Sequence, residues 1–172
     1  MKKMRRQLLS GLCATALVVG MMPGAIWASD AVTTRGMVAS VLYRLEGGPE
    51  AEDAGFSDVS ADAWYADAVN WAASVGVVAG YGDAFGANDA ITREQLAAIL
   101  CNYAAYKGED VSSGAALDGY SDAASVSDWA GESVEWAVAE GLLSGVTNNE
   151  LAPQGSATRA QVAAMLQRFN AR

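Results

Sequence analysis

The sequence predicts an all-α protein assembled from short repeated units, and three observations carry this prediction. A Thr-Arg dipeptide occurs three times, at spacings of 58 and 66 residues. A pair of tryptophans occurs twice, with an offset of 65 residues. Apolar residues near both motifs recur every three or four positions, the period of an amphipathic helix in a repeat protein. The motifs are Thr34-Arg35, Thr92-Arg93 and Thr158-Arg159, and Trp64 with Trp71 and Trp129 with Trp136.

Residues 1–28 have the pattern of a secretory signal peptide. Four basic residues lie within positions 2–6, and an uncharged, mostly apolar run of 15 residues follows from Leu8 to Met22. Ala28 then offers the small residue after which signal peptidase cleaves. The apolar run is short for a membrane span, which needs about 20 residues, so an uncleaved membrane anchor is the less favoured alternative. We therefore expect a secreted chain with no membrane span after processing.

Charge and composition exclude several classes of function. The chain has 11 Lys and Arg against 20 Asp and Glu, and loss of residues 1–28 would take its net charge from −9 to about −13. This sign argues against a nucleic-acid partner. The chain has no histidine, which excludes Ser-His-Asp and Cys-His catalysis and histidine metal sites. Cys101 would remain after processing, and we expect a small buried core residue rather than a reactive thiol.

The first helix of each full unit follows a Ser-Asp turn. In the second unit the apolar positions fall on one helical face, and Gly76 follows them as a C-terminal cap. In the third unit Glu140 takes the last apolar position, which we therefore place at the rim of the core. The apolar positions of the second unit are Trp64, Ala68, Trp71, Ala72 and Val75.

The second helix of each unit begins at the Thr-Arg dipeptide, after a glycine-rich loop. Thr92 with Gln95, and Thr158 with Gln161, match the capping box, in which each side chain accepts from the other residue's backbone N–H. The first unit has Met37 in place of the glutamine, so its box is incomplete. The apolar stripes are Val38, Val41, Leu42 and Leu45; Leu96, Ile99, Leu100 and Tyr103; and Val162, Met165, Leu166 and Phe169.

The first unit has only its second half, because the signal peptide stands where the first half should be. Linkers rich in Gly, Ser and acidic residues, at 46–55 and 108–119, separate the units. The three Thr-Arg helices could then supply a common core, with the two tryptophan helices outside it.

Four segments of the second unit, taken in order, resemble one repeat of the S-layer homology (SLH) domain. The resemblance spans residues 56–106, with a weaker copy at 120–170 and a C-terminal half copy at 31–46. The segments are Phe56-Ser57-Asp58-Val59, Trp64-Tyr65-Ala66-Asp67-Ala68-Val69, Gly76-Val77-Val78-Ala79-Gly80-Tyr81-Gly82-Asp83 and Ile91-Thr92-Arg93-Glu94-Gln95.

This resemblance implies an SLH-type fold, with helix–loop–helix repeats around a pseudo-threefold helical core and an incomplete first repeat. It implies non-covalent anchoring of a secreted protein to the bacterial cell wall. The implied partner is a secondary cell-wall polysaccharide or another peptidoglycan-linked glycan, which often carries acidic pyruvyl ketals. In this family the Thr-Arg motif is the place of binding.

The motif arginines are the leading candidates for ligand contact. A helix N-terminus already has a partial positive charge, so an arginine there indicates a nearby anion. We expect Arg93 and Arg159 to bind an acidic substituent of the glycan, with Arg35 as a weaker third site. Asp58 and Asp122 would orient the arginines. The alternative is that these aspartates simply pair with the arginines, in ion pairs worth about 0–1 kcal/mol.

Aromatic residues and glycines complete the candidate site. Trp64 and Trp129 could stack on sugar rings, although a core position is the simpler interpretation, as it is for the second tryptophan of each pair. Tyr81 is a candidate for sugar contact in one groove. Gly80 and Gly145 would allow the close approach of a neighbour or a ligand, or would serve as turn residues.

A rival interpretation is a secreted structural or interaction protein. It would self-associate through helix faces that the incomplete repeat leaves exposed. We expect no enzyme activity and no cofactor or metal, because the acidic residues sit at turns and caps. Asp83, Asn88 and Asp89 lack the spacing of a calcium loop. Because no cargo domain is present, we expect a protein that coats the wall by itself or a truncated gene product.

Overall fold

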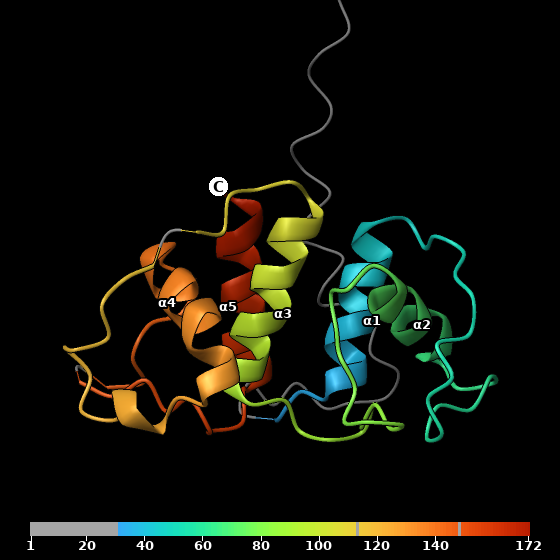
Figure 1. Cartoon of the computed structure of the whole chain (residues 1–172), viewed down its shortest axis with the longest axis horizontal. Coiled ribbons are helices and arrows are strands. Elements are labelled where there is room, and N and C mark those ends of the chain that lie inside the picture. The colour runs from blue at the N-terminus through green and yellow to red at the C-terminus, as the bar shows by residue number, and fades with distance from the viewer. Residues whose placement is uncertain (1–30, 113, 148) are drawn as a thin grey trace, which may run out of the picture.

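The structure is a computed structural model that describes residues 31–112, 114–147 and 149–172 (Figure 1). Within these ranges it consists of helices, turns and isolated β-bridges, which confirms the predicted all-α class. The predicted signal peptide lies outside the described residues. The elements are α1 (Arg35–Leu45), α2 (Ala66–Ser74), α3 (Arg93–Tyr106), the 3₁₀ turns η1 (Ala123–Ser125) and η2 (Asp128–Ala130), α4 (Gly131–Ala139) and α5 (Arg159–Asn170).

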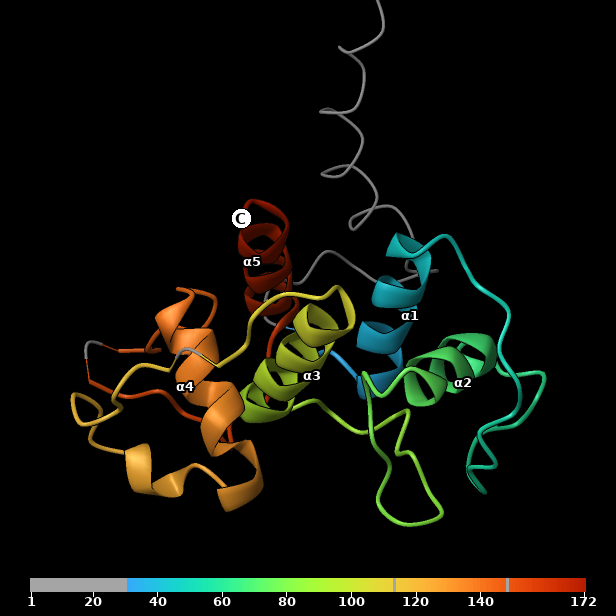
Figure 2. The same cartoon turned by 45° about the horizontal axis from the view of Figure 1, so that its top comes forward.

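The three Thr-Arg helices α1, α3 and α5 occupy the middle of the molecule (Figures 1 and 2). α2 packs on α1, and α4 packs on α3. Each tryptophan helix therefore covers the Thr-Arg helix of the preceding unit rather than that of its own unit. In the described part of the chain, no tryptophan helix packs on α5 in this way.

The predicted apolar stripes form one continuous core. All four stripe residues of α3, and all four of α5, are buried in it, as predicted. In α1, Val38 and Leu42 are buried, Val41 is half-buried and Leu45 is exposed. The stripe of α1 is thus shorter than the apolar spacing suggests.

A closed ring of backbone hydrogen bonds joins the segments that lead into the three Thr-Arg helices. Thr33 N–H donates to the Ala157 carbonyl at 3.0 Å, and Ala157 N–H donates to the Ile91 carbonyl at 2.8 Å. Ile91 N–H closes the ring by donating to the Thr33 carbonyl at 2.9 Å. Each of these residues lies two positions before a motif arginine, so the ring gives the core its pseudo-threefold arrangement.

A second set of hydrogen bonds surrounds this ring and fixes the register between neighbouring units. Each motif arginine donates its backbone N–H to a carbonyl four residues before the next motif arginine. The donor–acceptor pairs are Arg35 to Asp89 at 3.0 Å, Arg93 to Gly155 at 2.9 Å and Arg159 to Ala31 at 2.8 Å. The incomplete first unit is therefore in the same register as the two full ones.

The helix termini follow from local sequence. Thr92 and Thr158 form the predicted capping boxes at α3 and α5, and Thr34 caps α1 through the backbone N–H of Met37 alone. Gly76 and Gly141 have positive φ after α2 and α4, where glycine avoids the steric cost of a Cβ. In the Schellman motifs that result, the residue after each glycine donates back into the last helical turn.

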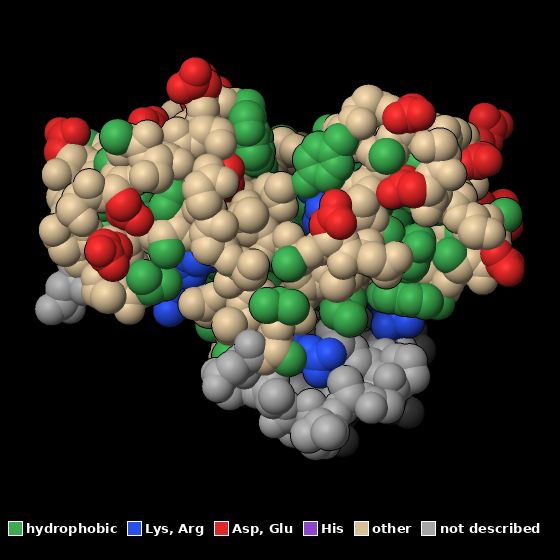
Figure 3. Space-filling model, turned by 90° about the horizontal axis from the view of Figure 1, so that it is seen from below, with side chains coloured by type: hydrophobic (Ala, Val, Ile, Leu, Met, Phe, Trp, Pro, Cys, Tyr) green, Lys and Arg blue, Asp and Glu red, His purple; other side chains and the backbone are tan. Residues whose placement is uncertain are grey.

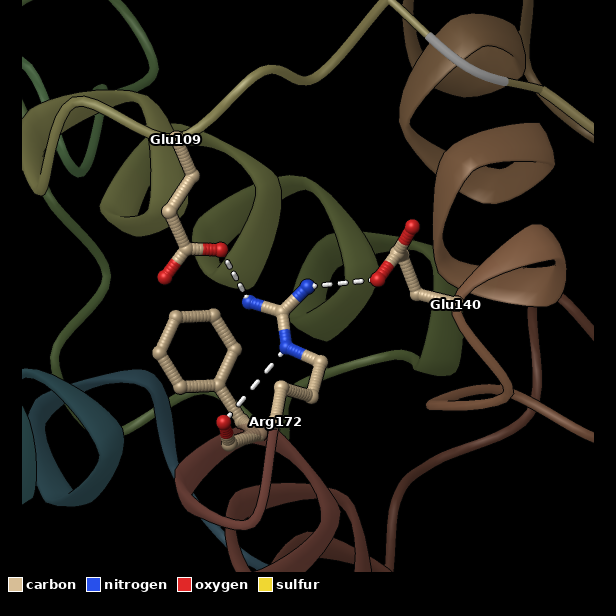
Figure 4. A network of polar contacts seen from close by, with 4 residues as sticks. Glu109, Glu140 and Arg172 are labelled. Atoms are coloured by element: carbon tan, nitrogen blue, oxygen red, sulfur yellow. Dashed lines mark hydrogen bonds and ion pairs between the residues drawn. The ribbon is translucent and has the colours of Figure 1, made fainter.

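The last residue of the chain ties three elements together (Figure 4). The Arg172 guanidinium contacts Glu109 at 2.5 Å and Glu140 at 2.9 Å. It also lies over the rings of Trp136 and Phe169, at 5.2 Å and 4.4 Å from their centroids. Glu140 is exposed, which confirms its predicted rim position, and it binds the chain terminus there.

Candidate functional site

Arg35 lies at a junction between the first and second units, which we call the Arg35 site. Its Nε donates to the Phe85 carbonyl at 3.0 Å, and its Nη2 donates to the Ala79 carbonyl at 2.6 Å. The guanidinium also lies over the rings of Tyr81 and Phe85, at 4.6 Å and 4.7 Å from their centroids. An arginine of α1 is therefore held by the glycine-rich loop of the next unit.

Arg93 repeats this arrangement between the second and third units, in what we call the Arg93 site. Its Nε donates to the Leu151 carbonyl at 2.7 Å, and its Nη2 donates to the Ser144 carbonyl at 2.5 Å. Leu151 and Val146 stand where the first site has aromatic rings, so the Arg93 guanidinium has no aromatic ring over it among the described residues.

Arg159 differs from both. Its Nε is buried and has no hydrogen-bond partner within the described ranges. The ranking of Arg35 as the weakest of the three arginines for ligand contact stays a prediction, and the loop surroundings that the structure describes are those of Arg35 and Arg93.

Both held arginines are nearly inaccessible cations. Arg35 is 5% exposed and Arg93 is 4% exposed. This burial lowers the pKa of both guanidinium groups below its ordinary value, and an arginine remains protonated at neutral pH all the same. In the part of the chain that the structure describes, neither Nη1 has a hydrogen-bond acceptor and neither arginine has an ion-pair partner.

Asp58 and Asp122 hold the loops that in turn hold the arginines. The Asp58 carboxylate accepts from the backbone N–H groups of Phe85 and Gly86, both at 2.7 Å. Asp122 accepts in the same way from Leu151 at 2.9 Å and from Ala152 at 2.7 Å. These hydrogen bonds are the main cause of the lowered pKa of each aspartate. Neither carboxylate forms a direct ion pair with an arginine in the described structure.

Gly80 and Gly145 are required by the packing of their own loops. A Cβ on Gly80 would collide with the Phe56 ring and would lie 2.6 Å from the Ala84 carbonyl oxygen. A Cβ on Gly145 would collide with the Thr147 carbonyl oxygen and would lie 2.9 Å from that of Glu150. Both glycines are therefore approached by backbone of their own loop, and Gly80 is approached by the Phe56 ring as well.

The tryptophans divide into two environments. Trp71 and Trp136 are buried, which confirms the predicted core position. The core interpretation was wrong for Trp64 and Trp129, which are 60% and 61% exposed. The reason is that α2 and α4 begin only at Ala66 and Gly131, so the first tryptophan of each pair precedes the helix and points away from its buried face.

Trp64 and Tyr81 lie near the Arg35 site. Trp64 packs edge-on against Tyr65, whose ring lies beside Gly36, the residue after Arg35. Tyr81 is half exposed, and its hydroxyl accepts a hydrogen bond at 2.8 Å from the capping glutamine Gln95. Tyr81 therefore lies directly against the arginine, whereas Trp64 is linked to it only through Tyr65 and Gly36.

Several structural residues escaped the sequence analysis. Ser57 and Ser121 donate from backbone and side chain to the carbonyls of Asp83 and Asn149, and so anchor each loop to the Ser-Asp turn. Their place beside the repeated aspartates is the signal that could have identified them. Glu94 is buried and accepts from Ser127, which adds a contact between α3 and the third unit.

The remaining expectations concern cysteine, metals and the membrane. Cys101 is a free, buried thiol, as predicted, and burial raises its pKa. The described residues contain no cluster of three or more acidic or cysteine side chains suited to a metal ion. Of the helices that the structure describes, none has the length and apolar character to cross a membrane.

Figure 3 looks onto the end of the molecule at which α1, α3 and α5 begin. Acidic side chains are spread mainly over the outer parts of this face, whereas basic side chains show as small areas closer to the middle. This distribution agrees with a strongly acidic protein whose cations are confined to a few positions.

Comparison with known proteins identifies the family. The S-layer homology domain matches residues 55–97 and 119–163. The chain is 34% identical to an amylopullulanase of Thermoanaerobacterium thermosulfurigenes and 33% identical to the exoglucanase XynX of Acetivibrio thermocellus. Each match covers 94% of this chain, but 9% and 15% of the relatives. The surface-layer 125 kDa protein of Lysinibacillus sphaericus is 36% identical over 69% of this chain and 10% of its own length. The chain therefore belongs to the S-layer homology domain family.

Proposed function

We propose that this chain attaches non-covalently to an acidic polysaccharide of the bacterial cell wall through the Arg35 and Arg93 sites. The family is one of cell-wall anchoring domains, and the matched relatives are named as a surface-layer protein, an amylopullulanase and an exoglucanase. The enzymatic names belong to proteins of which this chain covers 9% and 15%, so we assign it the anchoring role and no catalysis.

The observation that carries this proposal is a buried guanidinium with one unoccupied edge. Burial of a cation is costly unless the charge is paired. Backbone carbonyls hold Nε and Nη2 of Arg35 and Arg93, but within the described chain no carboxylate lies in ion-pair range of either. An anionic group from a ligand would supply the negative charge that pairs with the guanidinium. The planar guanidinium, which the carbonyl hydrogen bonds hold in one orientation, suits a carboxylate such as that of a pyruvyl ketal.

The overall charge of the chain supports a focused site rather than a broad surface. At a net charge of about −13 after processing, an acidic polymer is repelled by most of the protein. Attraction must then come from short-range contacts with individual cations. The exposed rings of Trp64, Trp129 and Tyr81 would add apolar contact with sugar rings, and so would select a glycan over a free anion.

Sedimentation with purified cell walls tests the proposal. We expect Arg35→Lys and Arg93→Lys each to weaken binding about tenfold. Lysine keeps the positive charge but lacks the planar guanidinium, whose charge-assisted hydrogen bonds are worth about 1.5–3 kcal/mol. Arg159→Lys shows whether the third arginine contributes. Arg44→Ala is the matched control, since Arg44 is an exposed cation on the same helix as Arg35. Retained circular dichroism confirms that each variant is folded.

Binding to walls from which the pyruvyl ketals have been removed distinguishes contact with the acidic substituent from contact with the sugar backbone. Loss of binding to such walls, for the unmodified protein, supports the ketal as the anion. Unchanged binding of the Arg35→Lys, Arg93→Lys double variant to intact walls would contradict the proposal.

A further inference from the structure

The Arg35 and Arg93 sites share one backbone framework, so their side chains can be compared position by position. In each site the equivalent aspartate binds two successive loop amides, and the motif arginine donates its backbone N–H to a carbonyl three residues after the second of these amides. A further equivalent position follows the glycine that packs against its own loop. At these three positions the sites differ: they carry Tyr81, Gly86 and Asp89 in the Arg35 site, and Val146, Ala152 and Gly155 in the Arg93 site.

The three differences depend on one another. A Cβ on Gly86 would collide with Oδ2 of Asp89 and would lie 3.1 Å from Cε2 of Tyr81. The Arg93 site has a methyl group at this position, on Ala152, and it has neither a carboxylate nor a ring at the other two positions. Gly86 therefore makes room for a ring and a carboxylate together, and the three residues of the Arg35 site form one set.

The Tyr81 ring is held in place and yet is open to solvent. Its hydroxyl accepts from Gln95 at 2.8 Å, and its centroid lies 4.6 Å from Cζ of Arg35. The residue is nevertheless 52% exposed. A ring that is already fixed loses little rotamer freedom on binding, so it suits stacking on the apolar face of a sugar. Val146, at the equivalent position, is also exposed but has no flat face to offer.

The negative charges near the two arginines differ as well. Asp89 is exposed, and it is outside ion-pair range of every cation in the described ranges. Burial lowers the pKa of both arginines, and more groups oppose this effect at Arg35 than at Arg93. The opposing groups are Tyr81, Asp89 and Asp58 around Arg35, and Asp122 around Arg93. A carboxylate beside a site repels an incoming anion but accepts hydrogen bonds from sugar hydroxyl groups.

We propose that the two sites bind different parts of the wall polysaccharide, and that Tyr81 and Asp89 determine the difference. The Arg93 site binds the acidic substituent, because fewer carboxylates lie beside its guanidinium. The Arg35 site binds a sugar ring of the same polymer, which stacks on Tyr81 and donates hydroxyl hydrogen bonds to Asp89. An acidic substituent adds less to binding there than at Arg93. This division rests on the proposed function, since it assigns a class of ligand to each of its two sites.

Amide chemical shifts of the isotope-labelled chain test the division, because each site has its own reporter amides. One probe is a small cyclic ketal of pyruvate, which carries the acid without a sugar. The other is a fragment of wall polysaccharide from which the ketals have been removed. We expect the ketal to bind at the Arg93 site about fivefold more tightly than at the Arg35 site. The fragment should shift the Arg35 reporters and leave the Arg93 reporters nearly unchanged. The reporters are the amides of Gly86 and Asp89 for the Arg35 site, and of Ala152 and Gly155 for the Arg93 site.

Exchange of the three positions between the sites tests the residues themselves. One variant gives the Arg35 site the residues of the Arg93 site, and a second variant does the reverse. We expect each exchanged site to acquire the ligand preference of the other. Because the three positions are exchanged together, neither variant places a methyl group against the aspartate. The variants are Tyr81→Val, Gly86→Ala, Asp89→Gly and Val146→Tyr, Ala152→Gly, Gly155→Asp.

Two single variants keep the proposal testable if the exchanged sites do not fold. Asp89→Asn removes the charge with little change of shape, and it should strengthen binding of the ketal at the Arg35 site about fivefold. Tyr81→Val should weaken binding of the fragment there. Tyr81→Phe is the matched control, since it keeps the ring and should retain the fragment.

The outcomes separate this proposal from the proposed function. Equal affinity of the two sites for the ketal, unchanged by Asp89→Asn, would overturn the division and leave wall attachment intact. Equal shifts of both sets of reporters by the fragment would overturn it too. If neither probe shifts either set of reporters, the proposed function fails, and the division fails with it.

Discussion

The Nε of Arg35 and the carbonyl of Phe85 form a 3.0 Å hydrogen bond across 50 residues of sequence. This bond places the arginine of one unit in the loop of the next, so each site exists only where two units meet. The equivalent bond between Arg93 and Leu151 spans 58 residues. Two complete sites therefore arise from two full units and one half unit.

Replacement of Arg93 by alanine should destabilise the fold as well as the site. It leaves the carbonyls of Leu151 and Ser144 without their donor, and an unsatisfied buried group costs about 1–3 kcal/mol. We expect the free energy of unfolding in urea to fall by roughly this amount. Arg44→Ala removes an exposed cation and should change it by less than about 0.5 kcal/mol. Equal losses of unfolding free energy in the Arg93→Ala and Arg44→Ala variants would contradict the role of Arg93 in holding the loop.

Alanine at Gly80 or Gly145 should also destabilise the protein, because the added Cβ would collide with atoms of the same loop. Overpacking of this kind typically costs about 1–3 kcal/mol. Gly131→Ala is the control, since Gly131 lies in a helix and has no atom within 4 Å of an added Cβ. Thermal unfolding should show a lowered Tm for the first two variants and an unchanged or raised Tm for the third.

The protein should lose stability in acid through Asp58 and Asp122. Their loop hydrogen bonds lower the pKa of both carboxyl groups below the ordinary 3.8. A lowered pKa in the folded state means that the folded form is stabilised when the pH is above 3.8, and this stabilisation is lost as the pH falls through the lowered value. Urea unfolding between pH 3 and pH 6 should show that Asp58→Asn, Asp122→Asn has a weaker acid dependence than the unmodified chain. If the double variant and the unmodified chain had the same dependence of stability on pH, Asp58 and Asp122 would not be the source of the acid sensitivity.

The two tryptophans of each pair should respond differently to substitution. Trp71→Ala removes a buried ring and should cost about 3–5 kcal/mol of stability. Trp64→Ala removes an exposed ring and should cost less than about 1 kcal/mol, while it weakens sedimentation with walls. Calorimetry and wall binding measure the two effects separately. Full wall binding by a Trp64→Ala, Trp129→Ala variant would remove these residues from the proposed site.

The features that could be predicted from the sequence depend on contacts between near neighbours in the chain. A capping box joins residues three apart, and a C-terminal glycine acts on the helical turn before it, so Thr92, Thr158 and Gly76 indicated where helices begin or end. The helical period likewise identified the stripes of α3 and α5. The start of the tryptophan helices was placed too early, because Trp64 lies at the correct spacing but outside the helix.

The sequence by itself determined the repeat, its helices and the residues that carry positive charge at their N-termini. Only the tertiary structure decided which loop holds which arginine, that Asp58 and Asp122 bind loop amides rather than guanidinium groups, and that the Nε of Arg159 has no acceptor among the described residues. These contacts join groups from 27 to 58 residues apart. Such pairings depend on how whole units pack around the backbone ring, and no local pattern of residues specifies them.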